Sequence, residues 1–144
     1  PLQGLVMMTR PGDIDAGIVL ELSKKFGANK ASEILNKESG LRGICREGDM
    51  LRVLERTRSP EEPQRRRAEL ALNVFVYSVQ KYIGSYFAIL GGCDALVFTG
   101  SIGSGSAKIR NMITKDLKIL KNTKVLAIKT DEELAIAQKI KNII

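Results

Sequence analysis

The sequence contains no histidine, and its only cysteines are Cys45 and Cys93. Without histidine, this segment cannot form a histidine-ligated metal site, a Ser-His-Asp triad or a histidine general base. Two cysteines with no framework spacing favour a reducing compartment, so we expect a cytoplasmic protein. No uninterrupted apolar run reaches about 18 residues, so no segment is expected to span a bilayer. The first residues also lack the pattern of a signal peptide.

The composition is that of a packed domain, with 44% apolar and 27% charged residues in a chain of 144. The net charge of +7 suits nucleic acid, an anionic membrane or a phosphorylated small molecule, but also a plain basic surface. Because the basic residues are not interleaved with aromatic ones, we favour the plain surface and expect neither nucleic acid nor membrane as partner. The chain begins with Pro1 rather than methionine, which suggests a piece of a longer polypeptide.

The first half of the sequence predicts short elements separated by polar turns. Residues 5–8 are a short apolar run typical of a strand, and residues 10–15 form a polar turn. Helices are expected over residues 18–25, ended by Gly27, and over residues 31–37, where Gly40 ends the turn. The polar stretch 56–67, with its two prolines, is expected to be an exposed connection but not a domain linker.

The second half shows clearer periodicity. Apolar residues recur at spacings of three and four over residues 70–90, which predicts a long helix whose apolar stripe packs in the core. Residues 95–99 and 125–128 are short apolar runs typical of buried parallel strands. A glycine-rich loop over residues 100–106 and a helix over residues 107–120 separate them. The last helix is expected to be capped by Thr130 or Asp131 and to bury Leu134, Ala135, Ile136, Ile140 and Ile143.

The order of these elements forms a βαβα unit with a right-handed crossover. Ligands of such sheets bind beyond the carboxyl ends of the strands. Residues 99–106 and 130–133 are therefore expected on the same rim.

The glycine loop is the first candidate ligand site. Gly100, Gly103 and Gly105 allow backbone amides to approach a phosphate, and the following helix start favours an anion. The loop is neither a Walker A motif nor the dinucleotide fingerprint, because the spacing differs. A tight strand-to-helix turn would use the same residues, so both interpretations stay open.

Three further groups have both a functional and a structural interpretation. Arg10 can stabilise a transferring phosphoryl group, and the aspartates that follow it can hold magnesium, or Asp13 can cap the next helix. The acidic residues 131–133 either hold magnesium or serve the dipole of the last helix. Asp49 and Arg52 either bind a ligand or form a surface ion pair.

Taken together, these segments resemble the acetate kinase family and, more distantly, the butyrate and propionate kinases. The resemblance covers nearly the whole chain and is carried by residues 1–15, 35–41, 71–77, 81–86, 91–99, 102–103, 106–107 and 130–137. It implies an α/β fold of the ribonuclease-H-like, actin-like ATPase class, with a mixed sheet flanked by helices. Residues 1–144 would form the carboxy-terminal, nucleotide-binding domain of such an enzyme, with the amino-terminal domain absent from this chain.

The resemblance also implies roles for individual residues. The family transfers the γ-phosphoryl group of ATP to acetate, with Mg²⁺ as cofactor, and works as a homodimer. Arg10 would be the catalytic arginine and Glu132, or its neighbour Glu133, the magnesium-linked glutamate. The nucleotide-binding positions would be Asp49, Met50, Arg52, Gly100, Ser101, Ile102, Gly103, Ser104 and Gly105. The alternatives are an acyl kinase with a larger carboxylate substrate and a non-catalytic nucleotide-binding module.

The sequence departs from the family pattern at several positions. Ser104 and Gly105 stand where the family has glutamate and asparagine, Ser101 where it has glycine, and Pro11 where it has serine. An ungapped alignment puts Arg52 on the family arginine but leaves Asp49 one position away from the family aspartate, where Met50 stands. The segment joining the helix that ends near Leu120 to the next strand is also shorter. Because catalytic groups of the family lie in the other half, we expect this piece to be inactive alone.

Overall fold

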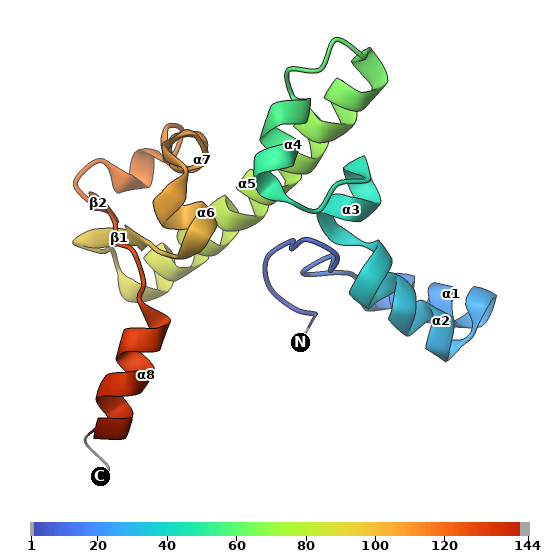
Figure 1. Cartoon of the computed structure of the whole chain (residues 1–144), viewed down its shortest axis with the longest axis horizontal. Coiled ribbons are helices and arrows are strands. Elements are labelled where there is room, and N and C mark those ends of the chain that lie inside the picture. The colour runs from blue at the N-terminus through green and yellow to red at the C-terminus, as the bar shows by residue number, and fades with distance from the viewer. Residues whose placement is uncertain (1, 142–144) are drawn as a thin grey trace. The chain divides into compact units, whose positions relative to one another are not determined.

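The first 90 residues fold into helices and loops, and both strands of the described structure come after them (Figure 1). The computed structural model describes residues 2–141, without the side chains of Glu132, Ala135 and Lys141. The chain divides into two compact units, Pro1–Ile83 and Gly84–Ile144. The boundary lies inside the long helix α5 (Glu62–Leu90). The polar stretch 56–67 is therefore no domain linker, as predicted.

The first unit contains the predicted short helices and two more. Helix α1 (Ala16–Phe26) ends at Gly27, whose φ of 80° breaks the helix before α2 (Ala28–Glu33). A π-helical turn (Ile34–Glu38) continues α2, and α3 (Gly40–Cys45) and α4 (Met50–Arg56) follow. Gly40 therefore begins a helix, whereas the sequence predicted that it would end a turn.

The strand predicted over residues 5–8 is wrong. These residues form no strand, because their backbone groups bond to a loop and to the start of α3. The carbonyls of Met7 and Met8 accept hydrogen bonds from the amides of Leu41 and Arg42, at 3.0 Å each. The first amides of a helix have no partner within the helix. Here they donate to the carbonyls that would otherwise bond to a neighbouring strand.

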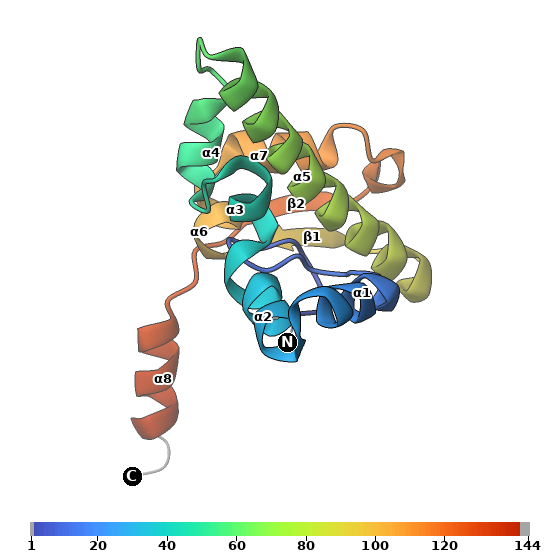
Figure 2. The ribbon, with the colours of Figure 1, turned by 90° about the vertical axis from the view of Figure 1, so that its right-hand side faces the viewer.

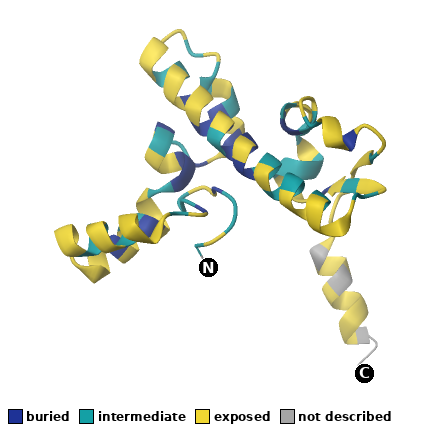
Figure 3. Cartoon of the chain, turned by 180° about the vertical axis from the view of Figure 1, so that it is seen from behind, coloured by how far each residue is buried: buried dark blue, intermediate teal, exposed yellow. Residues whose placement is uncertain are grey.

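Helix α5 begins at Glu62, so the exposed connection after α4 is shorter than predicted. Pro63 fits the first turn of the helix because its missing amide has no partner there. The buried apolar positions lie in the amino-terminal half of α5, at spacings of three and four: Ala68, Ala71, Leu72, Phe75 and Val76 (Figure 3). The apolar stripe therefore packs as predicted in that half, whereas Tyr86 and Leu90 are exposed.

The second unit contains the predicted pair of parallel strands, β1 (Ala95–Phe98) and β2 (Lys124–Ala127), side by side in Figure 2. The register pairs Ala95 with Lys124 and Phe98 with Ala127. The strands were predicted to be buried, but of their residues only Phe98 is, and the described residues contain no third strand to pair with them.

The elements between and after the strands differ from the prediction in length. The expected glycine loop is a short helix, α6 (Gly100–Gly105). Helix α7 (Ala107–Thr114) ends earlier than predicted, and a 3₁₀ turn, η2 (Lys118–Leu120), completes the connection to β2. Ile109, Ile113 and Leu120 are buried.

Helix α8 (Glu132–Lys141) is capped by Asp131, whose carboxylate accepts the Leu134 amide at 2.9 Å, as one of the two predicted caps. Its apolar side chains are exposed at Leu134, Ile136 and Ile140, so the predicted inward face is wrong. The helix extends away from the strands instead of packing on them (Figures 1 and 2). Ala135 and Ile143 lie outside the described side chains. Among the described residues, no helix is both long and apolar enough to cross a membrane.

Candidate functional site

Arg10 lies in a closed loop formed by residues 4–13, the Arg10 loop. Its two ends bond to each other: the Asp13 amide donates to the Gly4 carbonyl at 3.0 Å, and the Gly4 amide donates to Oδ1 of Asp13 at 2.9 Å. Gly12 adopts a φ of 74°, and a Cβ there would lie 2.6 Å from the Gly4 carbonyl oxygen. Only glycine fits this crossing of the chain.

One side of the Arg10 loop bonds to residues 36–42. Within the loop, the Met7 amide donates to the Arg10 carbonyl at 3.0 Å. The Thr9 hydroxyl donates to the Asn36 carbonyl at 2.7 Å. Three backbone amides also donate to the loop at 3.0 Å, from Ser39 to Thr9, from Leu41 to Met7 and from Arg42 to Met8.

Gly40 allows this close packing. Its φ is 65°, and a Cβ on it would lie 2.7 Å from the Arg10 carbonyl oxygen and 2.9 Å from the Arg10 nitrogen. It would also collide with the Met7 carbonyl oxygen. The backbone of Arg10 is therefore held directly against the start of α3.

The other side of the Arg10 loop is attached to α5 through Asp13. Oδ2 of Asp13 lies 2.9 Å from Nζ of Lys81, and the Tyr82 hydroxyl donates to the same carboxylate at 2.9 and 3.0 Å. The hydrogen bond from Lys81, followed by those from the Gly4 amide and Tyr82, lowers the pKa of Asp13 below its ordinary value. We call Asp13, Lys81 and Tyr82 the Asp13 clamp.

The clamp corrects the expectation that Asp13 caps the next helix. Asp15 is the cap of α1, since its Oδ1 accepts the Gly17 amide at 2.6 Å. Asp13 is instead the tertiary link of the loop. No local pattern signals this role, because Lys81 lies 68 positions after Asp13 in the sequence.

Asp49, Met50 and Arg52 lie at the start of α4. Asp49 is its N-cap, with Oδ1 accepting the Arg52 amide at 3.0 Å. The Asp49 carboxylate thus binds the backbone amide of Arg52. The ion pair predicted between Asp49 and the Arg52 guanidinium is not among the ion pairs of the described residues. Met50 is buried, whereas Arg52 is exposed.

Glu47 and Arg56 form a clasp, the Glu47 clasp, that holds residues 47–52 at the start of α4. We call these residues the Asp49 turn. Oε1 of Glu47 accepts the amides of Gly48 at 2.9 Å and Asp49 at 3.0 Å, and Oε2 pairs with Arg56 at 3.1 Å. The hydrogen bond from the Asp49 amide is the main reason that the pKa of Glu47 is lowered. Gly48 packs so closely on Met8 that a Cβ would collide with the Met8 side chain. The Asp49 turn and the Arg10 loop are therefore neighbours within the first unit.

The second unit holds the glycine-rich candidates in α6. Gly100 begins the helix with a φ of 68°, and its carbonyl accepts the Ser104 hydroxyl at 2.7 Å. Gly103 lies over Phe98, at a distance where a Cβ would make ordinary contacts of 3.5 Å. Ser101 and Gly105 are exposed, and Ile102 is half-buried.

Arg110 of α7 supports the end of α6 and was missed by sequence reasoning. Its guanidinium donates to the carbonyls of Gly103 at 2.8 Å and Ser104 at 2.9 Å. Carbonyls at the end of a helix lack partners, and an arginine is well suited to satisfy two of them.

The carboxyl ends of β1 and β2 point the same way, since the strands are parallel and Phe98 pairs with Ala127. The Ile128 amide extends this pairing, donating to the Phe98 carbonyl at 2.9 Å. Helix α6 follows one strand, and Glu132 begins α8 after the other. The predicted common origin of these two segments at one end of the sheet is therefore confirmed.

The residues considered for metal binding lie at the start of α8. The side chain of Glu132 lies outside the described residues, and the neighbouring Asp131 caps α8. Within the described part of the chain, no group of three or more acidic or cysteine side chains comes together to hold a metal ion.

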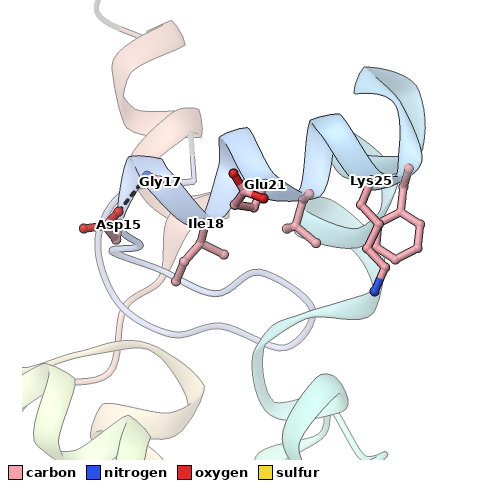
Figure 4. A pocket seen from close by; sticks show the side chains of 7 residues that line it. Asp15, Gly17, Ile18, Glu21 and Lys25 are labelled. Atoms are coloured by element: carbon pink, nitrogen blue, oxygen red, sulfur yellow. Dashed lines mark hydrogen bonds between the residues drawn. The ribbon is translucent and has the colours of Figure 1, made fainter.

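A hollow runs along α1. Asp15, Gly17, Ile18, Glu21, Leu22, Lys25 and Phe26 line it (Figure 4). All but Asp15 belong to one helix, and the side chains drawn in Figure 4 follow one face of it. Of the residues that the sequence offered as ligands, Asp15 lines this hollow, and its carboxylate accepts the Gly17 amide as the cap of α1.

The chain is similar to known proteins over nearly its full length. The model of the acetokinase family matches residues 1–140. An acetate kinase of Campylobacter concisus is 49% identical over 123 residues, which is 83% of this chain and 30% of that protein. An acetate kinase of a Sulfurovum species is 37% identical over the whole chain, which matches 42% of that protein. The chain thus spans less than half the length of these curated relatives.

The similarity extends to three-dimensional structure. The crystal structure of an acetate kinase from Entamoeba histolytica superimposes with a TM-score of 0.89 and 32% identity. The match covers 98% of this chain and 43% of that one. The predicted α/β fold of the actin-like ATPase class is thereby confirmed, with two parallel strands of its sheet in the described residues.

The chain has fewer residues than the part of a relative with which it aligns, and the connection between α7 and β2 remains the predicted place of that difference. The alignment with the Sulfurovum protein extends over 170 positions against 144 residues here, so at least 26 positions hold residues of the relative alone. In this chain, amides of Lys121 and Thr123 donate to the carbonyls of Lys118 and Leu120, which closes a tight turn before β2.

Proposed function

This chain belongs to the acetokinase family, and we propose that it forms the nucleotide-binding part of an ATP-dependent acetate kinase. On the family resemblance, the proposal covers residues 1–144 as the carboxy-terminal domain of such an enzyme, and the match spans less than half of each relative. The observation that carries it is the rigid Arg10 loop. Its arginine backbone is fixed from two sides, which is what a group acting on a transferring phosphoryl requires.

In the proposed reaction, a carboxylate oxygen of acetate attacks the γ-phosphorus of ATP. A bond forms between that oxygen and phosphorus, the bond to the β–γ bridging oxygen breaks, and ADP leaves with the electron pair. Phosphoryl transfer depends mainly on positioning and on charge stabilisation. We assign charge stabilisation at the phosphoryl oxygens to the Arg10 guanidinium, whose planar fork of donors matches phosphoryl oxygens.

The nucleotide contacts are assigned to the Asp49 turn and to α6. Asp49, Met50 and Arg52 are held by the Glu47 clasp, and Gly100, Ser101, Ile102, Gly103, Ser104 and Gly105 form α6. The absence of a side chain at Gly103 leaves its backbone open to close approach by a ligand. Its own surroundings would accept a Cβ, so packing within this unit does not explain the glycine.

Magnesium is proposed as the cofactor, with Glu132 as its protein ligand. Mg²⁺ in nucleotide sites is usually bound by one or two carboxylates together with phosphate oxygens, so a single glutamate is a sufficient protein contribution. The engagement of Asp131 in capping α8 leaves Glu132 and Glu133 as the carboxylates of this segment. When bound, the ion would neutralise charge on the phosphates.

We also propose that the enzyme is cytoplasmic and forms a homodimer. Both cysteines are free, and Cys45 is buried, as expected of a protein in the reducing cytoplasm. The family resemblance favours a homodimer.

The test is an assay of the protein that carries this sequence, at its native length, with ATP, Mg²⁺ and a panel of acetate, propionate and butyrate. We expect acetyl phosphate and ADP, with the highest kcat/KM for acetate. Preference for a longer acid would make it a related acyl kinase. Binding of ADP without turnover of any acid would make it a nucleotide-binding module. The 144-residue chain alone is expected to be inactive.

A further inference from the structure

The Asp13 carboxylate closes the Arg10 loop at Gly4 and attaches the loop to α5. It receives hydrogen bonds from the Gly4 amide, Nζ of Lys81 and the Tyr82 hydroxyl, each within 3.0 Å. These donors come from positions up to 69 residues away in the sequence. A carboxylate with this many donors serves as an anchor and is poorly placed to act as a metal ligand.

The Asp13 clamp and the start of α3 hold opposite ends of the same short segment. Before Arg10, the carbonyls of Met7, Met8 and Thr9 are bonded to α3 and the residue preceding it. After Arg10, the next tertiary attachment is Asp13, three residues further on. The backbone between these attachments carries the arginine, so loss of either one gives it freedom to move.

We propose that Asp13 is a positioning residue for Arg10, acting through its contacts with Lys81 and Tyr82. The inference rests on the proposed function, because it assigns to the clamp an effect on phosphoryl transfer. Exposed ion pairs usually contribute little to stability. The clamp is expected to matter through geometry instead, since a displacement of about 1 Å at a catalytic group can cost about a hundredfold in rate.

The test compares Asp13→Asn, Lys81→Met and the double variant in the protein at its native length. Each single variant is expected to lower kcat by about tenfold or more, with KM for ATP within about twofold, because positioning of the reacting groups is lost while substrate binding remains. The double variant is expected to be no slower than the slower single variant, because both changes break the same contact. Lys81→Arg should recover part of the rate.

The control is a second ion pair on the same helix. Arg66 pairs with Glu62 one turn away, and both side chains are more than half exposed. Glu62→Gln and Arg66→Met each remove one charge of the same sign as the tested variants, but both lie on α5 and leave the Arg10 loop untouched, so kcat should stay at the wild-type value.

A second measurement does not depend on activity. Amide hydrogen exchange of residues 2–12 should be faster in Asp13→Asn than in Glu62→Gln, since asparagine has one acceptor oxygen in place of two, loses the contact of Oδ2 with Lys81, and lets the loop open. The Asp13 positioning role is overturned if kcat of Asp13→Asn and Lys81→Met equals that of the controls, or if the two effects multiply in the double variant.

If the proposed kinase function is wrong, the assays give a different result. In that case wild-type protein transfers no phosphoryl group to any acid of the panel, and the role in catalysis falls with it. The exchange measurement then still decides whether Asp13 fixes the loop: unchanged exchange in Asp13→Asn would contradict the anchor itself.

Discussion

Nζ of Lys81 lies 2.9 Å from Oδ2 of Asp13, so a residue of the long helix α5 directly holds the loop that carries Arg10. The side chain of Lys81 is half exposed, and that of Asp13 is 32% exposed. Such a contact is open to titration and to substitution without disturbing a buried core.

The contribution of the Asp13 clamp to the stability of the folded protein should be lost at low pH. The clamp lowers the pKa of Asp13 below its ordinary value of 3.8, so the folded protein binds a proton there less readily than the unfolded chain does. The resulting stabilisation is therefore present above the unfolded pKa and is lost as pH falls through the folded pKa. A carbon-13 NMR titration of the Asp13 carboxyl should give a midpoint below 3.8 that rises in Lys81→Met. An identical midpoint in both proteins would contradict the clamp.

Gly40→Ala should damage the first unit. Its added Cβ would collide with the Met7 carbonyl and press on the backbone of Arg10, at a residue whose φ is 65°. The positive φ alone costs about 1–3 kcal/mol, and the collision adds to it. Denaturant unfolding measures the loss. Gly84→Ala is the control, because nothing lies within 4 Å of its added Cβ on α5, and it should stabilise by about 0.5–1 kcal/mol. Equal stability of the two variants would show that Gly40 is not tightly packed.

Gly103→Ala should separate folding from ligand binding. A Cβ here would make ordinary contacts with Phe98, and alanine is favoured over glycine in a helix, so stability should not fall. If the backbone of Gly103 lies against the nucleotide, the added methyl group should push the ligand away. We expect the affinity for ADP to drop by about tenfold or more, which corresponds to a loss of about 1.4 kcal/mol of binding free energy. Calorimetric titration with ADP and Mg²⁺ measures it, and wild-type affinity would remove Gly103 from the site.

Arg110→Met should loosen the end of α6. It removes two hydrogen bonds from a charged donor, to the carbonyls of Gly103 and Ser104. Hydrogen bonds to charged groups are worth about 1.5–3 kcal/mol each, so exchange of the α6 amides should accelerate and ADP affinity should fall. Lys108→Met is the control on the exposed side of α7. If both variants exchange at the same rate, Arg110 does not support α6.

The sequence was sufficient for those elements whose signal is local. The periodic apolar face of α5, the glycine after α1 and the apolar runs of β1 and β2 all predicted the observed structure. The predicted first strand failed because its hydrogen-bond partners are distant in the sequence. Residues 5–8 have the pattern of a strand, but their hydrogen-bond partners are amides at the start of α3, more than 30 residues away.

The same limit applies to the site. Arg10 and the glycines of α6 were found through residue type and family resemblance. Lys81, Glu47 and Arg110, which hold those segments, were not, because each acts on a residue whose position is set only by the fold. A lysine on a helix surface has the same sequence pattern whether it faces solvent or Asp13.

The most direct test of the account is the kcat of Arg10→Lys in the protein at its native length, with saturating ATP, Mg²⁺ and acetate. Lysine keeps the charge but cannot present two parallel donors to phosphoryl oxygens. Arginines that stabilise a transferring phosphoryl contribute about a thousandfold or more, so we predict a fall of that order in kcat with KM for ATP nearly unchanged. A kcat within a few-fold of wild type would contradict the central claim that Arg10 acts on the phosphoryl group.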